Sequence, residues 1–433
     1  MKKQTIYNLL FLFLTITISA QQTPAPKQTA DYSIEGATAH LGNGEIIENS
    51  LIMFSSGKIT FVGSALMKIA RMGTVINANG KHIYPGFIIA NSSLGLGEID
   101  AVRATLDDNE IGVMIPHVQS LIAYNAESKV VESVRPNGVL IGQITPRGGV
   151  ISGTSSIVQF DAWNWEDAAI KVNDGIHLNW PQSFSEGRPW RGEEAGTKPN
   201  KEYLKDVENI ASFVRAGKNY LNSSKSPKNL PYEALEGLFN GSKNLYVHAN
   251  GVKEITDAIN FSKEMEILKL VIVNGNDAYK IADLLVENNI PVIIERAHRL
   301  PNNEDDDYDL PYKTAKLLTE KGVVVAIGME GNMERMNSRN LPFYAGTCAA
   351  YGLNKEAALK LITFNAAKIL GIDDFAGTLE VGKDATLFIS EGDALDMRTN
   401  KLTDAFIQGR KISLETHQTK LWQRYGKKYS SQE

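Results

Sequence analysis

Eight short runs of apolar residues recur along the middle of the chain, and each ends in a polar or glycine-rich loop. They lie at residues 86–90, 138–144, 155–160, 175–178, 244–247, 268–273, 290–294 and 322–327. Near-continuous apolar strands are typical of sheets buried on both faces. Helical patterns lie between them, as at 276–289, where Ala278, Ile281, Ala282 and Leu285 share one face. The pattern predicts an α/β fold with a (β/α)8 TIM-like barrel, whose chemistry lies where the strands end.

Alternating β-rich runs bracket this middle section. Residues 34–47, 50–54 and 58–63 are separated by Gly-Asn-Gly and Ser-Ser-Gly-Lys turns, as hairpins require. A second β-rich set occupies 377–390 and 404–412. The two sets predict one small discontinuous β-sandwich built from both ends of the chain. The predicted domains are a sandwich at 33–83 and 373–415, a barrel at 84–372 and a C-terminal tail at 416–433.

The first twenty residues have the pattern of a signal peptide. Lys2 and Lys3 precede an apolar run at 9–18, and Ser19-Ala20 is a plausible cleavage site. Residues 21–32 then read as a linker. The run is short and Thr-containing for a membrane span, so the mature chain is expected to have no integral span, with an uncleaved anchor as the alternative. We expect an exported, periplasmic protein, and its single cysteine, Cys348, cannot form an intrachain disulfide.

The composition of the chain excludes some classes of binding partner but does not indicate an activity. The 433 residues are 43% hydrophobic, enough for one large barrel and one small domain. The net charge of −5 and the pI near 5.9 argue against nucleic acid or an anionic membrane surface, because both attract basic proteins.

Several phrases carry a family resemblance. They are Gly57-Lys58-Ile59, Val62-Gly63, Tyr84-Pro-Gly-Phe-Ile88, Gly377-Thr-Leu-Glu-Val-Gly-Lys-Asp-Ala385 and Gly409-Arg410. On these, the chain resembles the amidohydrolase superfamily, nearest to its imidazolonepropionase-like and prolidase-like members. The resemblance covers nearly all of the mature chain and implies a barrel with a metal-assisted hydrolytic site for C–N bonds.

Most metal-ligand positions of that family are substituted here. The two histidines of the first strand, His-x-His, correspond to Asn91 and Ser93, and the strand-six histidine to Asn274. Amides and hydroxyls are weak donors to the divalent cations of hydrolytic sites, which rest on imidazole, carboxylate or thiolate. These three residues are therefore expected to bind substrate.

Three residues remain as candidate zinc ligands. The resemblance matches His248 to the strand-five histidine and Glu330 to the strand-eight aspartate, and His177 lies nearest the strand-four position. Together they would make a two-histidine, one-carboxylate set, holding zinc weakly; no metal at all is the alternative. His248 and Glu330 are the predicted catalytic residues. Without metal, Glu330 would act as a general base, provided that burial raises its pKa.

Two features of the loops after the seventh strand are candidates for parts of the site. His298, after the seventh strand, is a candidate substrate-binding residue, with a loop ion pair as the alternative. Residues 302–309 contain five acidic side chains and read as a solvated loop, a lid for a cationic substrate or, more weakly, a calcium site.

Three functions fit these observations. The first is an exported hydrolase of C–N bonds, in cyclic amides or dipeptides, with a degraded metal site. The second is a non-catalytic amidohydrolase-like subunit whose barrel scaffolds an active partner or binds small molecules without turnover; the expected assembly is with an amidohydrolase partner subunit or as a homo-oligomer. The third is a sugar- or peptide-binding periplasmic protein that keeps only the scaffold.

Overall fold

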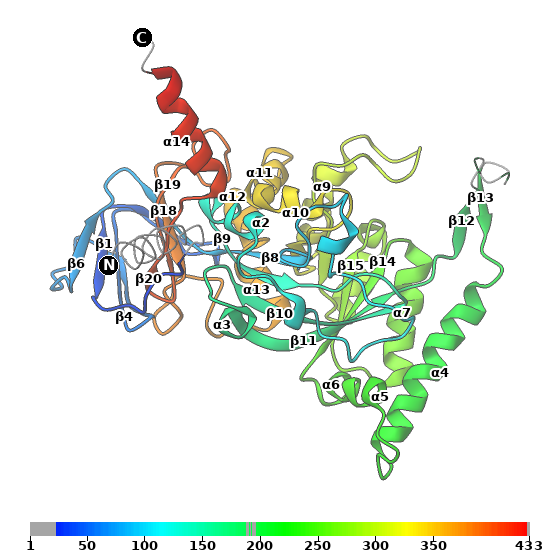
Figure 1. Cartoon of the computed structure of the whole chain (residues 1–433). Coiled ribbons are helices and arrows are strands. Elements are labelled where there is room, and N and C mark those ends of the chain that lie inside the picture. Colours follow the sequence, from blue (N-terminus) through cyan, green and yellow to red (C-terminus); the bar gives the residue numbers. More distant parts are fainter. Residues whose placement is uncertain (1–22, 188–189, 191, 193–195, 431–433) are drawn as a thin grey trace, which may run out of the picture.

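The computed structural model describes residues 23–187, 190, 192 and 196–430 (Figure 1). The predicted signal peptide, 1–20, lies outside the described residues. Within the described part of the chain, no helix combines the length and apolar character needed to cross a membrane.

Eight strands form a nearly closed barrel, which confirms the predicted (β/α)8-type fold. They are β8 (Phe87–Ser92), β9 (Val139–Ile144), β10 (Ile151–Gln159), β11 (Ala169–Asn179), β14 (Asn244–Ala249), β15 (Leu270–Asn274), β16 (Val292–Ile294) and β17 (Val325–Ile327). The sheet runs from β17 to β8 in reverse chain order, and a bridge between Ala90 and Gly328 joins its edges. Each of the eight predicted runs lies on one of these strands.

One strand departs from a regular (β/α)8 barrel. β10 pairs antiparallel with both β9 and β11, whereas the other barrel pairs are parallel. The loop before β10, residues 145–150, is too short for the crossover that parallel strands need. The turn after β10 contains only the short helix α3 (Trp165–Ala168). This part of the barrel is therefore a meander rather than a βα repeat.

Helices cover most of the remaining circumference (Figure 1). The longer ones are α4 (Tyr203–Leu221), α7 (Val252–Met265), α9 (Leu310–Glu320) and α11 (Leu341–Ala350); the shorter ones are α2 (Lys129–Glu132), α5 (Leu230–Ala234), α6 (Glu236–Asn240), α8 (Ala282–Glu287), α10 (Glu334–Asn337), α12 (Lys355–Lys360) and α13 (Phe364–Leu370). The hairpin β12 (Phe184–Glu186) and β13 (Thr197–Pro199) projects from the body, and α14 (His417–Ser430) ends the described chain (Figure 1).

Both ends of the chain contribute to the sandwich. One sheet has the order β5-β4-β1-β6, with β1 (Tyr32–Glu35), β4 (Ser50–Ser55), β5 (Lys58–Ser64) and β6 (Thr74–Asn77). The other has the order β20-β19-β18-β7-β2-β3, with β2 (Thr38–His40), β3 (Ile46–Ile47), β7 (His82–Pro85), β18 (Leu387–Ser390), β19 (Leu402–Ile407) and β20 (Arg410–Lys411). Because β7 pairs with both β2 and β18, the N- and C-terminal pieces form one discontinuous sandwich, as the sequence predicted.

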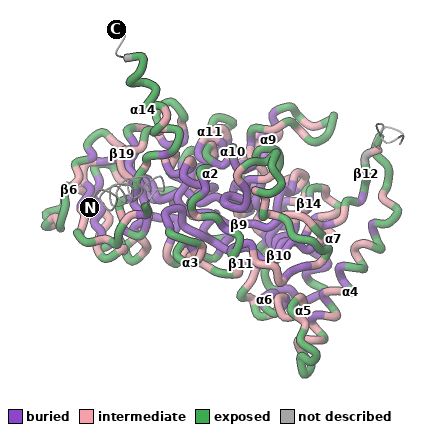
Figure 2. Tube along the Cα trace, viewed as in Figure 1, coloured by how far each residue is buried: buried purple, intermediate pink, exposed green. Residues whose placement is uncertain are grey.

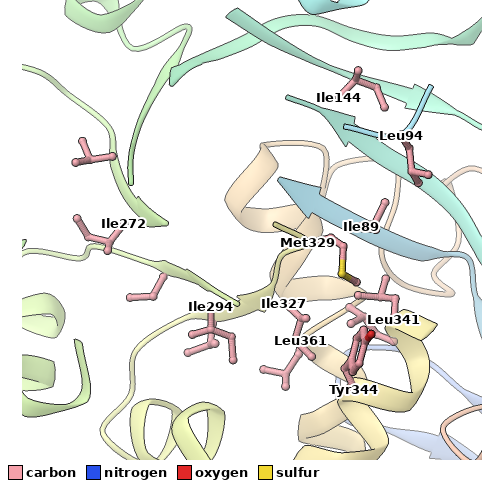
Figure 3. Close-up of a cluster of buried hydrophobic side chains, with 14 of the residues drawn as sticks. Ile89, Leu94, Ile144, Ile272, Ile294, Ile327, Met329, Leu341, Tyr344 and Leu361 are labelled. Atoms are coloured by element: carbon pink, nitrogen blue, oxygen red, sulfur yellow. The ribbon is translucent and has the colours of Figure 1, made fainter. Parts of the chain in front are cut away.

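The buried side chains form three clusters that correspond to these layers. Figure 2 shows buried stretches in both the barrel and the sandwich. Ile88, Ala90 and Val273 fill the barrel interior together with residues of α13. Alternate strand residues pack outward against the helices, as Ile89, Ile327 and Met329 do beside Leu341 and Tyr344 (Figure 3). The sandwich has its own core around Phe54 and Phe406.

A buried ion-pair cluster joins the sandwich to the barrel. Asp161, just after β10, accepts hydrogen bonds from Arg135 and from Arg410 on β20, both at 3.0 Å. The Asp161 side chain is almost fully buried. The two arginines thus tie the sandwich to the barrel wall.

Candidate functional site

The end of β8 turns the Asn91 side chain toward the strand ends. Strict alternation would place Asn91 on the outer face with Ile89, but its φ of +48° breaks the alternation, and the pairing with β9 shifts register there. Asparagine tolerates this left-handed conformation better than most residues. The Asn91 amide donates to Glu330 Oε2 at 2.8 Å. A locally strained backbone therefore links the first and last barrel strands.

Arg147 supplies a buried positive charge beside Asn91. Its guanidinium donates to Asn91 Oδ1 at 2.7 Å, to the Asn91 and Met329 carbonyls at 3.0 and 3.1 Å, and to Glu334 Oε2 at 3.1 Å. Burial alone would lower the pKa of Arg147, but the carboxylates of Glu334 and Glu330 outweigh it and raise the pKa. A permanent cation thus lies next to the first-strand position where the family resemblance would place a metal ligand.

Ser93 is also engaged within the protein. It donates a short hydrogen bond to Glu334 and accepts one from Arg335 at 2.9 Å. Arg335 in turn pairs with Asp108 at 2.7 Å and with Asp100. Asn91 and Ser93 therefore belong to an ion-pair network built around two arginines.

The three predicted zinc ligands lie in series. His248 Nδ1 lies 3.1 Å from Glu330 Oε2, and His248 Nε2 lies 3.0 Å from His177 Nδ1. His177 Nε2 continues to Ser155 Oγ at 2.9 Å. Both nitrogens of each imidazole are thus used within the protein.

A buried carboxyl ends this series. Asp174, on β11, is fully buried, and its Oδ1 lies 2.7 Å from Ser155 Oγ. Its Oδ2 accepts from Tyr246 Oη at 2.7 Å and from Gln143 Nε2 at 2.9 Å. Burial raises the pKa of Asp174 despite these hydrogen bonds.

The pKa of Glu330 is shifted in the opposite direction to that of Asp174. Burial alone would raise the pKa of its carboxyl, but His248, Arg147 and the Asn91 amide together hold it well below the ordinary value. The condition under which Glu330 was expected to be a good general base, a raised pKa, is therefore not met. Its Oε2 receives the hydrogen bonds of His248 and Asn91, whereas Oε1 accepts none within the described residues.

This donor set does not fit a resident catalytic metal. No group of three or more His, Cys, Asp or Glu side chains in the described ranges is arranged to hold a metal ion. His177, His248 and Glu330 are neighbours, but they bind one another rather than pointing at a common centre. The acidic side chains of residues 304–309 do not form such a group either.

The other predicted site residues lie differently. Asn274 ends β15 with a φ of +72°, and its side chain makes no hydrogen bond within the described part of the protein. His298 lies apart from the network: its Nε2 bonds Thr347 Oγ1 at 2.7 Å and its ring packs edge-on against Tyr344. In the acidic loop, Asp309 pairs with Lys313 at the start of α9.

Sequence reasoning missed Arg147, Glu334 and Asp174. Arg147 lies in the loop after the second predicted strand, and the loops that follow barrel strands carry functional residues. Its position could therefore have marked it as a candidate site residue. Glu334 lies four residues after Glu330. Asp174 was hidden because Asn173-Asp174-Gly175 reads as a turn, whereas β11 continues through it.

Comparisons with known proteins agree with this architecture. Residues 312–413 match the model of the Amidohydrolase family. The chain is 38% identical over 80 residues to an imidazolonepropionase of Symbiobacterium thermophilum, an alignment that covers 18% of this chain and 19% of that protein. It is 22% identical over 382 residues to an adenine deaminase of Clostridium botulinum, covering 85% of this chain and 55% of that enzyme. The chain thus spans little more than half of the curated relative that it matches over most of its own length.

The fold likeness extends further than the sequence likeness. The crystal structure of an amidohydrolase from Thermotoga maritima superimposes with a TM-score of 0.76 at 24% identity, covering 88% of this chain and 99% of that one. The family-model match over residues 312–413 and this shared architecture support the likeness to the amidohydrolase superfamily that the sequence motifs indicated.

Proposed function

We propose that this protein is an exported hydrolase of C–N bonds in small amides, such as cyclic amides or dipeptides, that acts without a tightly bound metal. The observation that carries the proposal is the geometry of Glu330. One carboxylate oxygen is fixed by His248 and Asn91, and the other accepts no hydrogen bond within the described residues, at the end of β17. Export rests on Lys2, Lys3 and the apolar run that follows them.

A water held by Glu330 Oε1 would attack the amide carbonyl. Glu330 accepts the proton of that water and passes it to the leaving nitrogen as the C–N bond breaks. Because the pKa of Glu330 is depressed, its carboxylate is a weak base, so turnover is expected to be slow. His248 holds the carboxylate in place.

Asn274 is the residue best suited to bind the substrate carbonyl. Its amide is free of internal partners in the described part of the chain, and Asn274 pairs in register with Ala249, next to His248. An amide N–H aimed at a carbonyl oxygen offers modest oxyanion stabilisation. Asn91, which the sequence placed in the same role, already donates to Glu330.

A second candidate function is a non-catalytic subunit or binding protein, working with an active partner or as a homo-oligomer. The hydrogen bonds of Asn91 and Ser93 favour this second function. Their side chains, which lie at the end of the first barrel strand, already bond Arg147, Glu334 and Arg335 rather than being left for a substrate. Such a site can hold its shape without performing chemistry.

The test is hydrolysis of a panel of cyclic amides and dipeptides by wild type, Glu330→Gln and the control Glu380→Gln. Glu380 is a partly exposed carboxylate paired with Lys383 in the sandwich. The proposal expects slow turnover by wild type and the control, unaffected by a chelator, and a loss of at least about tenfold in Glu330→Gln. Equal turnover in all three proteins would remove Glu330 from the mechanism. Calorimetric binding of the same compounds with no turnover would favour the non-catalytic function.

A further inference from the structure

The hydrogen bonds of the site close on themselves. A ring of seven residues, here called the barrel ring, connects strands around the interior. Its members are Asn91, Gln143, Asp174, Ser155, His177, His248 and Glu330. The closing links are Asn91 N to Gln143 Oε1 at 2.9 Å and Asn91 Nδ2 to Glu330 Oε2 at 2.8 Å.

Counting donors around this ring constrains its protons. Ionised Glu330 can only accept, so His248 Nδ1 must carry the hydrogen that points to it. If His248 is neutral, its Nε2 is an acceptor and His177 Nδ1 is the donor. A neutral His177 then accepts at Nε2, which takes the hydroxyl hydrogen of Ser155.

Asp174 is the last member of this series. Ser155 has one hydroxyl hydrogen, which in this arrangement points to His177. The 2.7 Å contact between Ser155 Oγ and Asp174 Oδ1 then requires a hydrogen from the carboxyl. Asp174 Oδ2 is already an acceptor, from Tyr246 and Gln143, so the carboxylic hydrogen must lie on Oδ1.

With Glu330 ionised, two other arrangements satisfy every link with the same number of protons. In one, His248 is an imidazolium and donates to His177; in the other, His177 is an imidazolium and donates to both His248 and Ser155. In both, Ser155 donates to an ionised Asp174. Both forms place a charged carboxylate at a fully buried position inside the barrel, where no ion pair to it is formed among the described residues. Lys171 attracts that charge, but the cost of burial outweighs this attraction and favours the neutral form.

We propose that Asp174 is a positioning residue that is protonated at neutral pH, donates to Ser155, and thereby fixes the tautomers of His177 and His248 so that His248 Nδ1–H faces Glu330. The assignment stands on the geometry of the free protein. Its importance for turnover rests on the proposed function.

An isosteric substitution distinguishes a protonated Asp174 from an ionised one. In Asp174→Asn, the Nδ2 group donates to Ser155 as the acid does, while Oδ1 accepts from Tyr246 and Gln143. The proposal therefore expects the ring ¹⁵N shifts of His177 and His248 to match wild type and the thermal midpoint to stay within about 2 °C. If Asp174 were ionised, the variant would set an amide donor against the Ser155 hydroxyl and change both readouts.

A serine pair provides the matched control. Ser155→Ala removes the link and is expected to shift the His177 and His248 ¹⁵N signals. Ser156→Ala should leave them unchanged, because the Ser156 hydroxyl accepts from the Asn173 backbone N–H and makes no other hydrogen bond within the described residues. If the ¹⁵N shifts of His177 and His248 are the same in Ser155→Ala as in wild type, the proposal is wrong.

Infrared spectroscopy tests the protonation state without a variant. Wild-type protein carrying ¹³C-labelled aspartate should show the band of a protonated carboxylic acid at neutral pH. Absence of that band, or two protonated nitrogens on either His248 or His177, would refute the assignment. No substrate is needed, so these results stand or fall separately from the hydrolase proposal, which the turnover assay decides.

Discussion

Replacing Arg147 by methionine should destabilise the protein more than any exposed charge substitution. The change keeps an unbranched side chain but removes the buried cation that bonds Asn91, the Met329 carbonyl and Glu334. The side chains of Arg147 and Glu334 are only 17% and 11% exposed, so Glu334 would be left as a largely buried carboxylate without its ion-pair partner. Breaking a buried pair in this way costs about 3–5 kcal/mol.

The chain contains a matched control for this substitution. Arg215, on α4, pairs with Glu208 at 3.3 Å, but its side chain is 47% exposed and that of Glu208 is 64% exposed. Arg215→Met should therefore cost less than about 1 kcal/mol. Urea unfolding followed by tryptophan fluorescence gives the free energy of unfolding for the wild type and both variants.

The comparison also has a clear failing outcome. If Arg147→Met and Arg215→Met lose similar free energies, Arg147 is not the structural cation of the site and its internal bonds contribute little. If Arg147→Met instead unfolds about 3–5 kcal/mol more easily, the first-strand residues owe their positions to that guanidinium.

Two further predictions concern acid and metal. The pKa of Glu330 is held below its ordinary value of 4.5, so its ionisation stabilises the folded state fully above that pH, and this stabilisation is lost as the pH falls. The difference in unfolding free energy between wild type and Glu330→Gln should therefore decrease below about pH 4. A constant difference from pH 7 to pH 3 would contradict this expectation. Asn91, Ser93 and Asn274 offer no imidazole, and both ring nitrogens of His248 are hydrogen-bonded within the protein. Protein that is loaded with zinc and then extensively dialysed should therefore retain far less than one zinc per chain by elemental analysis. One tightly held zinc ion per chain would show that these side chains do form a metal site.

Local signals made most of the fold predictable. A strand buried on both faces must be apolar along its length, so the eight barrel strands are visible as runs such as 268–273. The turns Gly-Asn-Gly and Ser-Ser-Gly-Lys likewise mark hairpins without knowledge of their partners. The antiparallel direction of β10 was harder to predict, because an apolar run has the same pattern in either direction. Only the short loop between β9 and β10 indicated that the two strands are antiparallel.

The sequence alone therefore determined the barrel and the two-ended sandwich, and it placed Asn91 and Ser93 at the end of the first barrel strand. Tertiary structure decided what those residues do. Arg147 becomes a fixed cation only because β8, β17 and α10 bring Asn91, Met329 and Glu334 to it. Asp174 can be a buried acid inside a strand only because Gln143, Ser155 and Tyr246, from three other strands, satisfy its oxygens. Such arrangements depend on contacts between residues far apart in the chain, and no local pattern of hydrophobic and polar residues records them.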